Sequence, residues 1–76
     1  MNNINEELIL SLPNNTTYST IETIILSLIS SITNKQDKEL LVKVYSEILN
    51  RKKQNKDLYP ILLEIKLVLI KVLKNK

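Results

Sequence analysis

The sequence predicts an all-α protein, with one domain over residues 1–76 folded as an antiparallel up-down four-helix bundle. Three observations predict this fold class. Apolar residues recur at helical spacing in four separate segments. Glycine, on which tight β-hairpins depend, is absent from the chain. The connections between the four segments are short, and short connections favour antiparallel neighbours in a bundle.

The first predicted helix covers residues 4–12. Asn3 is the expected N-cap, because Glu6 follows three residues later, as in a capping box. The polar run that begins at Pro13 is expected to end this helix, since proline does not continue one. Apolar side chains share one face of the segment: Ile4, Leu8 and Leu12.

The second predicted helix covers residues 20–32. Ser19 is the expected N-cap, and Glu22 is expected to reach back to it in a second capping box. The many β-branched residues lower the intrinsic helix propensity, so a strand over residues 23–29 is the alternative. Helix is preferred because apolar and polar residues do not alternate strictly. The apolar residues follow helical spacing: Ile21, Ile24, Ile25, Leu28, Ile29 and Ile32.

The third predicted helix covers residues 35–53 and is the most clearly amphipathic. Two ion pairs are expected at i,i+4 spacing, Glu39 with Lys43 and Glu47 with Arg51, each worth about 0.2–0.5 kcal/mol. The basic end of the helix also suits the negative pole of the helix dipole. One apolar stripe runs along the segment: Leu40, Leu41, Val44, Tyr45, Ile48 and Leu49.

The fourth predicted helix covers residues 57–74, with Asp57 as the expected N-cap and Pro60 tolerated in the first turn. It is apolar almost all round, so we expect the other helices or a partner to bury it. Its expected core face carries three residues: Leu62, Ile65 and Leu69. A buried Glu64 would be a candidate functional site, but an exposed position on an outer strip shared with Lys71 is preferred. The segment is too short and too charged for an ordinary transmembrane span.

The composition argues against catalysis. The chain has no His and no Cys, and its acidic residues are scattered, which leaves no histidine general base, no cysteine nucleophile and no metal-ligand cluster. We therefore expect no enzyme activity, catalytic residue, cofactor or metal. The absence of cysteine and of a signal-peptide pattern at the N-terminus predicts a cytoplasmic protein.

Positive charge is concentrated in the C-terminal third of the chain. The net charge of +3 arises because residues 51–76 carry eight Lys or Arg and two acids. We call residues 51–57 the elbow. Such asymmetry predicts a negative partner, which could be an acidic protein patch, an anionic membrane surface or a nucleic acid. Nucleic acid is disfavoured, because the chain has a single Arg and no aromatic residue interleaved with the basic run.

A family resemblance covers the third and fourth segments. The sequence Val44-Tyr45-Ser46-Glu47-Ile48-Leu49, a Lys-rich turn and then Pro60-Ile61-Leu62-Leu63-Glu64-Ile65-Lys66-Leu67-Val68-Leu69-Ile70 resemble the immunity proteins of pediocin-like (class IIa) bacteriocins. The enterocin A immunity group is the most similar. These are small cytoplasmic four-helix bundles of Gram-positive bacteria, often with a Val-Tyr pair in helix 3 and a Pro before a Leu-rich helix 4.

The resemblance implies a non-catalytic function. Members of the family protect the producing cell by acting on the complex between a bacteriocin and its receptor, the membrane part of the mannose permease. Their C-terminal half is thought to select the bacteriocin, which by position implies these partner-binding residues: Arg51, Lys52, Lys53, Lys56, Tyr59, Lys71, Lys74 and Lys76. Many members carry a tail after helix 4, whereas this sequence stops at Lys76, so determinants in that tail are not expected here.

Two other classes of function stay open. The chain could be a small helical regulator that binds a protein or forms a homodimer through its fourth helix. It could also be a basic nucleic-acid-binding module. In each case the basic residues of the elbow are expected to lie off the apolar stripe. We therefore expect their replacement to leave the helices intact.

Overall fold

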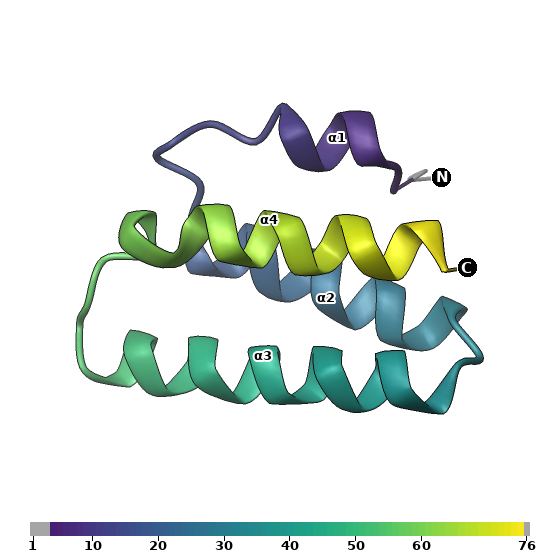
Figure 1. The fold of residues 1–76 in the computed structure, drawn as a ribbon. Helices are drawn as coiled ribbons and strands as arrows, with labels where there is room; N and C mark the ends of the chain where they lie inside the picture. The colour runs from purple at the N-terminus through teal and green to yellow at the C-terminus, as the bar shows by residue number, and fades with distance from the viewer. Residues whose placement is uncertain (1–3, 76) are drawn as a thin grey trace.

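The computed structural model describes residues 4–75, and every regular element in that range is an α-helix. Successive helices run in opposite directions, so the described chain begins and ends at the same end of the bundle (Figure 1). Helix α2 packs against α3, α3 against α4, and α4 against α1. The predicted all-α four-helix bundle is therefore confirmed. The helices are α1 (Glu6–Leu10), α2 (Tyr18–Ser31), α3 (Lys35–Lys53) and α4 (Tyr59–Lys74).

The core is a single aliphatic cluster to which all four helices contribute. The predicted core face of α4 is confirmed, because Leu62, Ile65 and Leu69 are all buried. Of the predicted apolar stripe of α3, Leu41 and Ile48 are fully buried. The largest fully buried side chains come from every helix: Ile9, Ile21, Ile25, Leu28, Leu41, Ile48, Leu69 and Val72.

Helix α1 is shorter than predicted and begins at a different cap. Asn5 is the N-cap, and its side-chain oxygen accepts a hydrogen bond of 2.8 Å from the Leu8 N–H. The predicted cap, Asn3, lies outside the described residues. The helix ends at Leu10 instead of Leu12. A residue that precedes proline is disfavoured in the α conformation, so Pro13 excludes Leu12 from the helix.

The beginning of α2 also differs from the prediction. Thr17, not Ser19, is the N-cap, and its hydroxyl accepts a hydrogen bond of 3.2 Å from the Thr20 N–H. Glu22 does not return to the cap but pairs with Lys52 of α3 at 3.4 Å. The earlier start places Tyr18 inside the helix, where its hydroxyl donates a 2.6 Å hydrogen bond to the Lys56 carbonyl. These two contacts between elements favour the longer helix, and the strand alternative is wrong.

Helix α3 has the predicted bounds, but its two expected i,i+4 ion pairs are not formed. Within residues 4–75, ion pairs join Lys52 to Glu22 and Lys74 to Glu6. Arg51 instead donates a hydrogen bond of 2.7 Å from Nη2 to the Asp57 carbonyl. A side chain held by the elbow in this way is directed away from Glu47, one turn earlier in the helix.

The elbow reverses the chain without a glycine. Asn55 adopts the left-handed conformation, with φ at 58°. The Lys56 N–H donates to the Arg51 carbonyl and the Asn55 N–H to the Lys52 carbonyl, both at 3.1 Å. These two bonds form a Schellman motif, which ends α3. The predicted cap Asp57 does not cap α4, because Leu58 occupies that position in helical conformation with no side-chain cap bond.

We expect Asn55→Gly to stabilise the protein by about 0.5–1 kcal/mol, because glycine adopts positive φ without a Cβ penalty. The matched control is Asn50→Gly, which lies inside α3 and should destabilise by about 0.3 kcal/mol, the difference between the helix propensities of asparagine and glycine. Urea denaturation followed by circular dichroism would measure both changes. A loss of stability in Asn55→Gly would show that the asparagine side chain contributes more to the elbow than its backbone conformation costs.

Candidate functional site

Two of the four basic residues of the elbow make contacts within the protein. The Arg51 side chain is half-buried and holds the Asp57 carbonyl, and its Nε is buried without a hydrogen-bond partner among the described residues. The Lys52 side chain forms an ion pair with Glu22 on α2. The four basic residues are predicted to lie off the apolar stripe; of these, Arg51 is half-buried and bonded within the elbow. Lys53 and Lys56 remain exposed at this end of the bundle.

The other predicted contact residues lie at the far end of α4. Lys71 and Lys74 occupy its last turns, and Lys74 lies 3.9 Å from Glu6 of α1. At 1.5 Å per residue, about 18 Å of helix separates Tyr59 from Lys71. The predicted residue Lys76 lies outside the described range. The structure thus places the predicted basic residues near both ends of α4, with most of an apolar helix between them.

Helix α1 covers one half of α4 and leaves the other half open. Lys66 donates a hydrogen bond of 2.7 Å from Nζ to the Leu12 carbonyl, and the pair between Lys74 and Glu6 fixes the other end of α1. Figure 1 shows the short helix beside the C-terminal part of α4. Beside the first turns of α4 on that side lies no helix but the loop between α1 and α2, from which Asn14 comes close to Tyr59 and Leu63. The other helices therefore leave part of α4 exposed, and burial of that part by a partner stays a prediction.

An exposed apolar ridge follows from this open side. Tyr59, Leu63 and Leu67 are 61%, 66% and 58% exposed. We call these three residues the α4 ridge. Their i, i+4, i+8 spacing aligns them on a helix face away from the core residues. The spacing is visible in the sequence, but it indicates an exposed face only once the neighbours of α4 are known. Large exposed apolar residues grouped in this way are typical of interaction surfaces.

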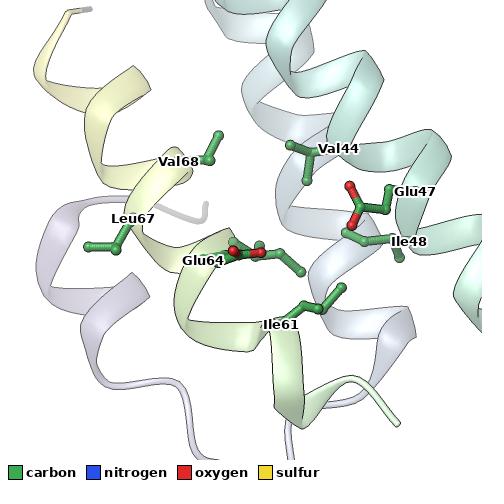
Figure 2. Close-up of a pocket in the computed structure, with 8 residues that line it drawn as sticks. Val44, Glu47, Ile48, Ile61, Glu64, Leu67 and Val68 are labelled. Carbon is green, nitrogen blue, oxygen red and sulfur yellow. The ribbon is translucent and has the colours of Figure 1, made fainter. Parts of the chain in front are cut away.

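A groove of about 300 Å³ lies between α3 and α4, directly beside the ridge. Figure 2 shows Val44 on α3 and Val68 on α4 facing this groove from opposite sides, with Ile61 at one end. Two carboxylates, of Glu47 and Glu64, lie along the same groove (Figure 2). The predicted exposure of Glu64 is confirmed. We call this feature the α3–α4 groove; its lining is Val44, Glu47, Ile48, Ile61, Glu64, Ile65, Leu67 and Val68.

A second hollow, of about 360 Å³, lies at the beginning of α4. Tyr59 and Leu63 of the α4 ridge line it together with Asn14 from the loop between α1 and α2. The ridge therefore stands between two hollows. An apolar projection with recesses on either side is suited to packing against another protein surface.

The described residues contain no cluster of three or more acidic side chains placed to hold a metal ion. None of the helices in residues 4–75 has the length and hydropathy needed to cross a bilayer. No protein-family model, curated protein or solved structure matches the chain.

Proposed function

We propose that the chain is a non-catalytic immunity protein that protects a bacteriocin-producing cell by acting on the complex of a pediocin-like bacteriocin with its permease receptor. The proposal rests on where the family-like segments and the exposed surface residues lie in the fold. The segments that resemble this family form α3, the elbow and α4, and the same half of the molecule bears the α4 ridge and the exposed elbow lysines.

The bundle would act in the cytoplasm by docking on the inner face of the bacteriocin-loaded permease. In this proposal, Lys53 and Lys56 steer the approach electrostatically, and Tyr59 supplies an apolar anchor beside them. Exposed cations at a protein surface mainly affect the association rate and specificity, while desolvated aromatic residues contribute more of the affinity. Contact with an anionic leaflet through the same lysines would add to this attraction.

A second candidate, a small helical regulator, is also supported by the α4 ridge, because an exposed apolar ridge suits any protein partner. The nucleic-acid alternative is weakened by the elbow. Arg51 and Lys52 are engaged within the protein, which leaves fewer cations there for phosphate groups.

The test is to express the protein inside a sensitive Gram-positive cell and measure resistance to a panel of pediocin-like bacteriocins. We expect the inhibitory concentration of at least one such bacteriocin to rise, with no change for pore-forming peptides that use other receptors. Cells with the empty vector are the control. Unchanged sensitivity to the whole panel in cells that contain the folded protein would refute the proposal. A salt-sensitive gel shift with DNA or RNA would then favour the nucleic-acid alternative.

A further inference from the structure

The α4 ridge and the α3–α4 groove are adjacent on one face of the same molecule. Leu67 belongs to both, because it forms the edge of the groove while its side chain turns outward from it (Figure 2). A projecting apolar residue beside an apolar recess is the arrangement that an isologous dimer requires, since each copy must offer both halves of the contact.

The charges along the outer side of α4 are also self-complementary. Glu64 lies one turn before Leu67 and Lys71 one turn after it, and both are exposed. Within the described part of the chain, neither residue takes part in an ion pair. In an antiparallel pairing of two α4 helices, residues at equal distances from the two-fold axis face each other. An axis beside Leu67 and Val68 therefore brings Glu64 of each copy opposite Lys71 of the other.

We propose that the chain forms a two-fold symmetric dimer in which the α4 helices of two copies pack antiparallel. Leu67 of each copy lies against Val68 and the mouth of the groove of the other copy, and Leu63 extends the apolar contact. Two symmetry-related ion pairs between Glu64 and Lys71 flank this centre. Glu47, on the opposite wall of the groove, adds negative potential where the second copy's lysine arrives.

A second copy fits this face better than an unrelated cationic peptide does. A cationic peptide would satisfy Glu47 and Glu64 but would leave Lys71 without a partner. The second copy supplies an anion and a cation at matching positions. The contact involves one helix of 16 residues, about 24 Å long, from each copy. Because so short a contact is smaller than a typical stable interface, we expect a dimer that dissociates on dilution.

Sedimentation velocity between about 1 μM and 1 mM protein tests the proposal directly. We expect a concentration-dependent shift from monomer to dimer. Leu67→Asp should remain a monomer, because the substitution places two carboxylates at the two-fold axis. A monomer throughout this range for the unmodified chain would overturn the proposal. Assemblies larger than a dimer would overturn it too, because a closed two-fold contact ends at two copies.

Swapping the charges of Glu64 and Lys71 distinguishes the proposed contact from non-specific association. Glu64→Lys and Lys71→Glu should each weaken the dimer at least about tenfold, since each places like charges opposite one another. An equimolar mixture of these two variants should dimerise again, because one copy then carries two lysines opposite the two glutamates of the other and both ion pairs form. The double variant E64K/K71E should also dimerise. Failure of both combinations to recover dimerisation would overturn the proposed register.

The matched controls change the same charges elsewhere. Glu39→Lys and Lys38→Glu alter exposed positions of α3 with the same changes in net charge, and neither should affect dimerisation. Equal effects of control and test variants would assign the association to net charge and overturn the proposed contact. The inference is independent of the immunity proposal. Protection by a strictly monomeric protein would refute the dimer alone, and a dimer without protection would refute immunity alone.

Discussion

Replacement of Leu69 by alanine is expected to remove most of the stability of the fold. Leu69 is fully buried in α4, with 0% of its surface exposed. Truncation of a buried leucine costs about 2–5 kcal/mol, because the lost transfer free energy is joined by the cost of the cavity left behind. A domain of this size rarely has more than about 3–5 kcal/mol available. We therefore expect Leu69→Ala to be largely unfolded or close to its unfolding midpoint in buffer.

The matched control is Leu67→Ala, the same chemical change two residues earlier in the same helix. Because Leu67 is 58% exposed, its truncation should change the free energy of unfolding by no more than about 0.5 kcal/mol. Urea denaturation at low micromolar protein, followed by circular dichroism at the helix band, measures both variants. Unchanged midpoints for Leu69→Ala and for Leu62→Ala would contradict the core described above.

Reversal of two elbow charges is expected to abolish protection if the immunity proposal is correct. The variant is K53E/K56E, because these two lysines are exposed. Arg51 and Lys52 are left unchanged, since they hold the Asp57 carbonyl and Glu22. The backbone groups of Lys56 that bond to Arg51 and Tyr18 are retained in the variant. Helicity and the unfolding midpoint should therefore stay close to those of the unmodified protein.

The control for this variant is K38E/K43E, which makes the same change in net charge at exposed positions in the first half of α3. We expect it to protect as well as the unmodified protein does. The measurement is the inhibitory concentration of the bacteriocin to which the unmodified protein confers resistance. Full protection by K53E/K56E would remove the elbow from the proposed docking surface. Equal loss in both variants would attribute the effect to overall charge.

The sequence was sufficient to predict the helices but not all of their ends. Periodic apolar residues identify a helix because they are set by the core that it must face. The caps were harder to predict, because several side chains within a few residues can accept the same N–H groups. Thr17 and Ser19 are two such candidates at the beginning of α2. The choice depended on Tyr18 and Glu22, whose partners lie on other elements.

The interaction surface could be predicted less well than the fold. The sequence of a helix shows how apolar the helix is, but it does not show which faces the neighbouring helices cover. The exposed side of α4 depends on where α1 stops, and that depends in turn on Pro13. The two glutamates of the groove come from different helices and meet only through the packing of α3 against α4. No local sequence pattern connects them.

The small size of α1 has a consequence for how the bundle opens. This helix has five residues, and Ile9 is the one fully buried side chain that it contributes. An isolated helix of such length is not stable in water, so α1 depends on its contacts with α4. Because α1 contributes one fully buried side chain, we expect its local opening to cost less free energy than global unfolding. Detachment of α1 would expose the adjoining apolar surface of α4 while α2, α3 and the elbow stay folded. We therefore expect the apolar surface that α4 presents to be larger when α1 is detached than it is in the closed bundle.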